Sequence, residues 1–149
     1  MLRFSMETGV MNTDNKMCNI SLTSSMEDYL EAVLVLQQKH GYIRCVDVAG
    51  YLGVTKPSVS RALKELSKKK CLIKKDDGTL SLTEQGRQIA QQIYEKHQFF
   101  TKQLIEAGVP RDIAVQDACR LEHVISETSF NKLKEAAWMK AQEVIPSEK

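Results

Sequence analysis

The stretch from Asp47 to Leu66, DVAGYLGVTKPSVSRALKEL, decides the fold that we expect for this chain of 149 residues. Gly53 predicts a tight turn between two helices, Thr55 predicts a cap for the second helix, and Pro57 fits its first turn. We expect five apolar side chains to fill the angle between the helices: Val48, Leu52, Val54, Val59 and Leu63. The pattern is typical of a helix-turn-helix, and an ordinary helical hairpin is the simpler alternative.

The residues on either side predict the rest of a small domain. A helix should begin at Ser24 or Ser25, with the hydroxyl as its cap, and run to about Lys39 before Gly41 ends it. A short helix over about residues 46–52 follows. Two strand-like runs, 71–75 and 80–83, are separated by an Asp-Gly pair, which is a hairpin signal. A hairpin directly after a helix-turn-helix is a wing.

The second half of the chain predicts helices only. A long helix should begin after Thr83, with an apolar stripe, and end at Gly108 and Pro110, before two more helices at about 110–125 and 127–143. The stripe consists of Ile89, Ile93, Phe100 and Leu104. The expected fold class is therefore mainly α with a small β-hairpin wing. We expect a flexible leader (1–23), a winged helix-turn-helix domain (24–83), a helical domain (84–143) and a tail (144–149).

Composition excludes several classes of protein. The hydrophobic fraction of 42% and the net charge of +2 are ordinary for a globular chain. The four cysteines lie far apart with no paired CxxC spacing, which argues against a disulfide framework and a zinc ribbon and favours a reducing cytoplasm. No apolar run is long enough for a signal peptide or a membrane span, so we expect no membrane partner.

Basic residues are concentrated on the predicted second helix of the motif and on the wing. Between Lys56 and Lys75 there are eight basic residues and one acid, Glu65. Such a run alone is often only a solvated face, but on a winged helix-turn-helix it favours contacts with DNA phosphates. Arg61 is the expected guanine-contacting residue. The candidate DNA contacts are Thr55, Lys56, Pro57, Ser58, Ser60, Arg61, Lys64, Lys74 and Lys75.

Two groups of residues have the spacing of metal ligands. Asp28 and Glu31 are three residues apart on the first predicted helix, so both carboxylates share one side. Cys119, Glu122 and His123 stand at i, i+3 and i+4, which places a thiol, a carboxylate and an imidazole on one face. The simpler alternatives are that the acids belong only to a helix start and that Cys119 is a small buried hydrophobe.

His97 lies on the apolar stripe of the long helix, between Ile93 and Phe100. Considered alone, it is better explained as a core histidine. If this helix packs between the first helix and the helix at 110–125, however, His97 faces both groups of candidate ligands. A mixed oxygen, nitrogen and sulfur set suits manganese, iron, cobalt or zinc better than magnesium or calcium.

Four segments resemble one known family. They are SMEDYLEAV (25–33), PSVS (57–60), the helix with His97, and DACRLEHVIS (117–126). In this order they resemble the family of the diphtheria toxin repressor and the manganese transport regulator, over about residues 24 to 140. The resemblance implies that 24–83 is the DNA-binding domain and that 84–143 binds metal and dimerises. The chain should lack the SH3-like third domain of longer members.

The resemblance also implies a ligand set. Asp28, Glu31, His97, Glu122 and His123 match the ligands of the manganese-responsive branch. Cys119 departs from that branch, which has glutamate there, whereas the iron-responsive branch has this cysteine but methionine in place of Asp28. We therefore expect Mn²⁺ or Fe²⁺, at one or two ions per subunit, with Zn²⁺ or Co²⁺ able to bind in vitro. The iron branch's ancillary site should be absent, because Thr101 and Val115 stand where it needs an acid and an imidazole.

The implied function is a cytoplasmic, metal-dependent transcriptional regulator, a repressor of metal-uptake genes. It would bind a palindromic operator in double-stranded DNA as a homodimer, with the metal as corepressor. The expected dimer contacts are Phe130, Leu133, Ala137 and Trp138. One alternative is a metal-independent winged-helix regulator that responds to a small molecule. An enzyme using Cys119 and His123, or a metal hydrolase, is a poorer alternative, because no orienting group or nucleophile motif is visible.

Overall fold

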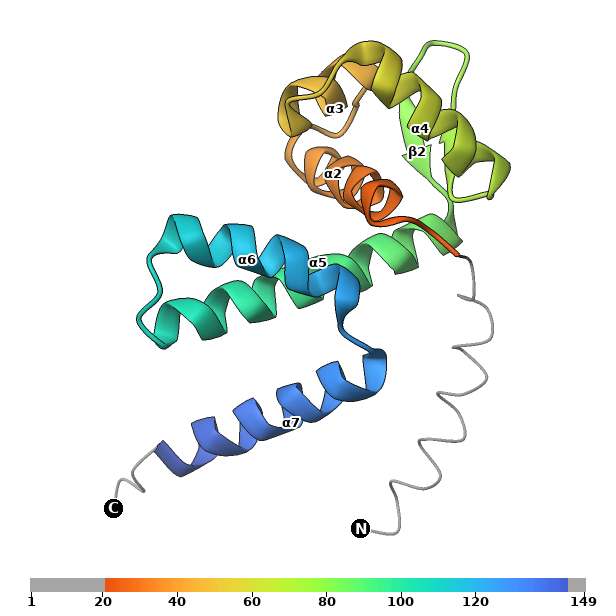
Figure 1. The fold of residues 1–149 in the computed structure, drawn as a ribbon. Helices are drawn as coiled ribbons and strands as arrows, with labels where there is room; N and C mark the ends of the chain where they lie inside the picture. The colour runs from red at the N-terminus through yellow and green to blue at the C-terminus, as the bar shows by residue number, and fades with distance from the viewer. Residues whose placement is uncertain (1–20, 145–149) are drawn as a thin grey trace, which may run out of the picture. The chain divides into compact units, whose positions relative to one another are not determined.

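A computed structural model describes residues 21–144 of the chain, and the expected leader residues 1–20 and tail residues 145–149 lie outside this range. The described part is mainly helical, with one two-stranded hairpin (Figure 1). Its elements are α2 (Ser24–His40), α3 (Cys45–Leu52), α4 (Lys56–Lys68), β1 (Leu72–Lys74), β2 (Leu80–Leu82), α5 (Glu84–Glu106), α6 (Arg111–Val124) and α7 (Glu127–Val144). The predicted fold class is confirmed.

The chain divides into two compact units, one up to Gln92 and one from Ile93 onward. We call them the first and second unit and describe each by itself. The division falls inside α5, nine residues after the boundary at 83/84 that the sequence predicts, so that boundary stays a prediction. None of the described helices is long and apolar enough to span a membrane.

Helix α2 supplies much of the first unit's core. Leu30 and Val33 are fully buried, and Gly41 ends the helix with φ of 76°. The cap is Thr23, whose Oγ1 accepts a hydrogen bond from the Met26 N–H at 3.2 Å. The prediction that Ser24 or Ser25 caps the helix is therefore wrong by one or two residues. Thr23 has the extended backbone that a cap requires, whereas both serines already belong to the helix.

Helices α3 and α4 form the predicted helix-turn-helix. Gly53 adopts the left-handed conformation, at φ of 68°, and Thr55 Oγ1 caps α4 by accepting the Ser58 N–H at 3.3 Å. Val48, Val59 and Leu63 are buried between the helices as expected. The prediction was wrong for two other side chains, since Leu52 is only half-buried and Val54 is exposed. Val54 lies in the turn itself, where its side chain faces solvent.

The wing is an antiparallel hairpin with Leu72 opposite Leu82 and Lys74 opposite Leu80. At its tip Gly78 has φ of 87°, and the hydroxyl and amide of Thr79 donate hydrogen bonds to Asp77. These bonds hold the pKa of the Asp77 carboxyl below its ordinary value. The predicted hairpin is confirmed.

Helix α5 begins in direct contact with the residues before the wing. Thr83 caps it by accepting the Gly86 N–H at 3.0 Å, and the same hydroxyl donates to the Lys70 carbonyl at 2.7 Å. A Cβ on Gly86 would lie 1.9 Å from the Cys71 carbonyl oxygen. Only glycine fits this position, so the start of α5 is fixed against the backbone of the first unit.

The core of the second unit is aromatic. Phe100 of α5, Ala118 of α6 and Phe130 of α7 form a buried cluster, and Phe99 packs edge-on against both phenylalanine rings at 5.3 and 5.4 Å. Phe130 is only 2% exposed, so it belongs to the core of its own chain. Of the expected dimer contacts, Leu133 and Trp138 are exposed on α7.

Candidate metal centre and nucleic-acid interface

The second unit brings three of the predicted ligands together. His97 of α5 lies with its Nδ1 2.9 Å from Glu122 Oε2 and 3.6 Å from Cys119 Sγ of α6. One donor atom from each residue lies within 4.8 Å of the others. The i, i+3 spacing on α6 turns the thiol and the carboxylate toward the same imidazole. A thiol, an imidazole and a carboxylate at these distances form a candidate transition-metal centre.

Among the members of this group, the Glu122 carboxylate gives the strongest indication of a bound cation. The residue is 2% exposed, and its Oε1, although 3.4 Å from His123 Nε2, makes no hydrogen bond among residues 21–144. A buried carboxylate oxygen without a hydrogen bond is costly unless a positive charge compensates it. The residues present therefore fit a bound cation.

The simpler explanations for two of these residues are not supported. Cys119 is exposed, so it is not a small buried hydrophobe. His97 interacts with Glu122 and Cys119, which is more than the packing of an apolar stripe requires. His123 lies beside Glu122, with a side chain that is 7% exposed. Asp28 and Glu31 are half-buried on α2 in the first unit, and their part in the ligand set stays a prediction.

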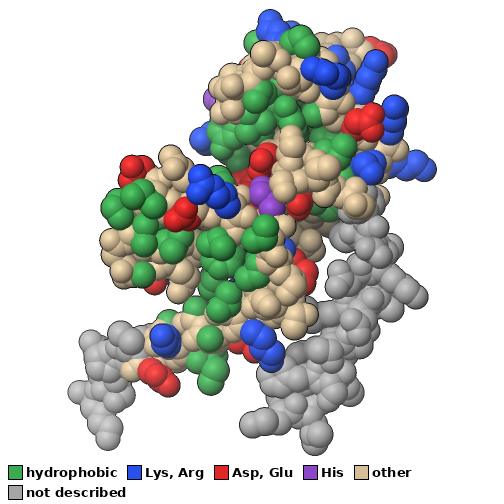
Figure 2. All heavy atoms as spheres, viewed as in Figure 1, with side chains coloured by type: hydrophobic (Ala, Val, Ile, Leu, Met, Phe, Trp, Pro, Cys, Tyr) green, Lys and Arg blue, Asp and Glu red, His purple; other side chains and the backbone are tan. Residues whose placement is uncertain are grey.

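The predicted DNA contacts lie on α4 and the wing of the first unit. Eight of the nine are exposed, and the ninth, Ser58, is half-buried with its hydroxyl 2.9 Å from Thr55 Oγ1. Figure 2 shows basic side chains projecting into solvent from this part of the molecule. None of the five basic members of the set has an ion-pair partner among the described residues: Lys56, Arg61, Lys64, Lys74 and Lys75. Unpaired cations on a helix-turn-helix and its wing suit a polyanion such as DNA.

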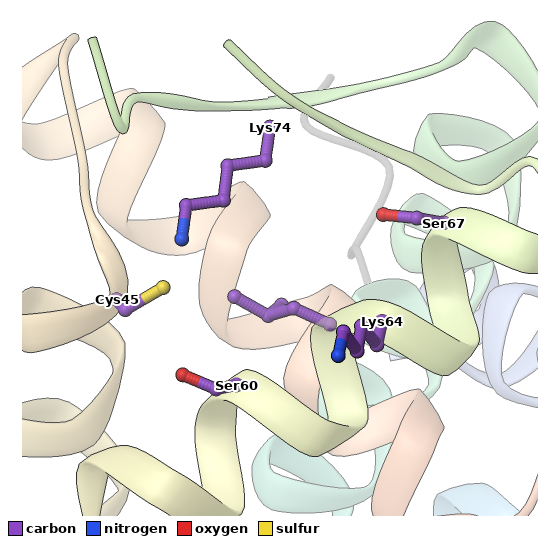
Figure 3. Close-up of a pocket in the computed structure, with 6 residues that line it drawn as sticks. Cys45, Ser60, Lys64, Ser67 and Lys74 are labelled. Carbon is purple, nitrogen blue, oxygen red and sulfur yellow. The ribbon is translucent and has the colours of Figure 1, made fainter. Parts of the chain in front are cut away.

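One feature of this face could not be predicted from the sequence. A cavity lies beside α4, lined by Ser60, Lys64 and Ser67 together with Cys45 and Lys74 (Figure 3). The i, i+4, i+7 spacing of the three α4 residues predicts a shared helix face. The cavity needs side chains from three elements, however, and sequence spacing alone does not place those elements side by side.

Comparisons with known proteins give matches to both halves of the chain. Residues 21–80 match the model of the iron dependent repressor N-terminal DNA binding domain, and residues 83–137 match that of the iron dependent repressor metal binding and dimerisation domain. The regulator MntR of Geobacillus kaustophilus is 32% identical over 111 residues, which is 74% of this chain and 79% of that protein. The chain belongs to the DtxR/MntR family.

Comparisons with other members of this family give the same result. The transcriptional regulator MntR of Escherichia coli O157:H7 is 33% identical over 109 residues, covering 73% of this chain and 70% of that protein. Among solved structures, the manganese regulator SloR matches with a TM-score of 0.69 and the metal-dependent regulator MtsR with 0.71, each at 26% identity. The match to SloR covers 75% of this chain and 53% of that structure, and the match to MtsR covers 78% of this chain and 54% of that structure. The chain thus spans about half the length of these two structures.

Membership of the DtxR/MntR family decides between the functional alternatives. The chain is a metal-dependent, DNA-binding transcriptional regulator with a DNA-binding and a dimerisation domain. The metal-independent regulator that responds to a small molecule is not supported. The family is one of regulators, so the enzymatic alternatives receive no support from it either.

Proposed function

We propose that this DtxR/MntR family member is a cytoplasmic repressor that a divalent metal, Mn²⁺ or Fe²⁺, activates for operator binding. The observation that supports the proposal best is the buried Glu122 carboxylate, one oxygen of which makes no hydrogen bond among the described residues. A divalent ion supplies the charge that this oxygen needs. In the proposal His97, Cys119, Glu122 and His123 hold the ion, and Asp28 and Glu31 complete the ligand set.

The chemistry of the donor atoms limits which metal ions the site should prefer. Carboxylate oxygens favour manganese, whereas a thiolate favours softer ions such as iron and zinc, so the Cys119 thiol shifts the preference toward Fe²⁺. Zn²⁺ and Co²⁺ should bind in vitro for the same reason. The solved relatives include a manganese-activated repressor, ScaR, and the same protein with bound Zn²⁺. One or two ions per subunit are compatible with the six donors.

The DNA partner in this proposal is a palindromic operator in metal-uptake genes. A homodimer presents two α4 helices, which fit half-sites about one helical turn apart. Arg61 contacts guanine, and Thr55, Lys56, Pro57, Ser58, Ser60, Lys64, Lys74 and Lys75 contact neighbouring bases and phosphates. Metal binding raises the population of dimers whose spacing fits the operator, which makes the metal a corepressor.

The first test is the variant His123→Ala. We expect metal to raise the operator affinity of the unchanged protein by roughly 5 to 150-fold, the usual size of allosteric coupling, and to raise that of the variant hardly at all. The measurement is fluorescence anisotropy on a duplex selected from a random pool, anaerobically, with each ion in turn. Circular dichroism and the metal-free DNA affinity establish that the variant is folded.

The matched control is His40→Ala, because His40 is exposed in the last turn of α2 and belongs to neither proposed site. It should keep the full metal response. Stimulation that survives in His123→Ala contradicts the proposed ligand set. If no divalent metal raises the affinity of the unchanged protein, the proposed function fails.

A further inference from the structure

One lysine outside the proposed ligand set is buried in the second unit. Lys96 of α5 is 9% exposed, and its Nζ lies 2.5 Å from Glu127 Oε1 at the start of α7. The same ammonium lies 5.8 Å from the centre of the Phe130 ring. A buried ammonium is costly unless a negative charge compensates it, so Glu127 supplies the partner that this lysine requires.

The position of this ion pair along the chain relates it to the candidate ligands. Lys96 immediately precedes His97 on α5. Glu127 follows Glu122 by five residues, across the turn between α6 and α7. The ion pair therefore joins the same two segments of chain as the 2.9 Å hydrogen bond between His97 Nδ1 and Glu122 Oε2.

The ion pair and the hydrogen bond differ in the atoms that they use. The hydrogen bond joins atoms that would themselves bind an ion, whereas the Lys96–Glu127 pair uses none of the proposed donor atoms. The ion pair can therefore hold the two segments together with or without a metal. Ligands that are already held at the right spacing bind an ion more tightly, because less conformational freedom is lost on binding.

We propose that Lys96 is a positioning residue for the metal centre. Its ion pair with Glu127 holds the part of α5 that carries His97 against the end of α6 that carries Glu122. Lys96 itself donates nothing to the ion and acts through the spacing of these two ligands. The inference rests on the proposed function, because it concerns the metal affinity of that same centre.

The charge of Lys96 alone predicts the opposite effect on metal binding. A neutral residue at this position leaves the Glu127 carboxylate unpaired, which makes the surroundings of the site more negative by one charge. A negative charge attracts a divalent cation, so an effect of charge would make metal binding tighter. An effect of position would make it weaker. The sign of the change therefore distinguishes the two.

The first readout is the affinity of Lys96→Met for Mn²⁺ and Co²⁺, measured anaerobically by isothermal titration calorimetry. Methionine keeps an apolar stem beside Phe130 and removes the ammonium. Loss of a residue that orients metal ligands typically weakens metal binding by about 10 to 100-fold, and we expect a loss of this size. Lys96→Arg keeps the positive charge and the hydrogen-bond donors, so it should retain most of the affinity.

The matched control is Lys134→Met. Lys134 of α7 also pairs with a carboxylate of α5, Glu95, at 2.7 Å, and its Nζ lies 4.7 Å from the centre of the Phe130 ring. The control therefore removes the same charge and breaks an ion pair between the same two helices. Lys134 stands 12 residues beyond Glu122, however, so its ion pair does not hold the end of α6. Its metal affinity should stay within error of the unchanged protein.

The second readout is the visible absorption of bound Co²⁺, because its bands depend on the number and arrangement of the ligands. At saturating Co²⁺ the bands should change in position or intensity in Lys96→Met and stay the same in Lys134→Met. Circular dichroism establishes that each variant is folded. Lys96→Leu takes the place of Lys96→Met if the methionine variant does not fold.

A metal affinity of Lys96→Met that is unchanged or tighter overturns the inference. An equal loss in Lys134→Met also overturns it, because both ion pairs would then act only by holding α7 in place. A Co²⁺ spectrum that stays the same in Lys96→Met does so as well, since the ligands would not have moved. If the unchanged protein binds neither ion, the proposed function fails, whereas the other outcomes concern Lys96 alone.

Discussion

At the scale of single residues, the proposed metal centre depends most on one carboxylate and one thiol. The i, i+3, i+4 spacing of Cys119, Glu122 and His123 predicts a shared helix face. In the structure Cys119 Sγ and Glu122 Oε2 lie 3.6 and 2.9 Å from His97 Nδ1, and the binding of a metal by these residues stays a prediction. The burial of Glu122 and the missing hydrogen bond at its Oε1 could not be predicted, because both depend on what packs around α6. The spacing of residues on α6 therefore predicts which side chains share a face. Only the packing around α6 shows the buried carboxylate whose negative charge favours a bound cation.

The residue-scale prediction concerns the thiol. Co²⁺ bound through a thiolate has an intense near-ultraviolet charge-transfer absorption that oxygen and nitrogen ligands do not produce. We expect this band when Co²⁺ is added anaerobically to the unchanged protein, and we expect it to be lost in Cys119→Ser. Cys45→Ser is the control and should keep the band, because Cys45 lies on α3 in the first unit. A band of equal intensity in Cys119→Ser would remove the thiolate from the ligand set.

At the scale of elements, helix ends were predicted well where glycine decides them. Gly41 and Gly53 end α2 and α3 with positive φ, as expected. The cap of α2 was predicted less well, since three hydroxyl residues stand in a row and only the backbone conformation chooses Thr23. The fit of α5 against Cys71 was not predicted at all, because it joins residues 15 apart whose contact depends on the wing.

The element-scale prediction is a pair of glycine substitutions. Gly86→Ala forces a Cβ to within 1.9 Å of the Cys71 carbonyl oxygen and should lower the free energy of unfolding by about 1 to 3 kcal/mol or more. Gly50→Ala is the control, since Gly50 is helical with nothing within 4 Å of the added Cβ. It should raise that free energy by about 0.5 to 1 kcal/mol. Urea titration measures both, and equal stabilities would contradict the close approach at Gly86.

At the scale of the whole molecule, basic side chains without ion-pair partners are unevenly distributed, although the net charge is only +2. In the second unit most basic side chains are paired with acids, as in Lys96 with Glu127 and Lys134 with Glu95. In the first unit the cations of α4 and the wing are mostly unpaired among the described residues. The run of basic residues was visible in the sequence. The absence of ion-pair partners for these basic residues could not be predicted, because such partners can come from elements distant along the chain.

The whole-molecule prediction concerns the homodimer. Trp138 is 65% exposed on α7, which suits an aromatic anchor in a dimer interface. Trp138→Glu should raise the dimer dissociation constant at least about tenfold, measured by analytical ultracentrifugation, and weaken operator binding in parallel. Gln142→Glu adds the same charge at another exposed position of α7 and should change neither. Unchanged dimerisation in Trp138→Glu would place the interface elsewhere.

The junction of Thr83 and Gly86 has a consequence for recognising distant relatives. A capping hydroxyl followed three positions later by a glycine that no larger residue can replace forms a short signature, TxxG, just after a wing. In a chain too divergent to align, we expect this signature after two short apolar runs to mark where a long helix begins after the wing. It would locate the start of that helix from four residues, before any ligand residue is identified.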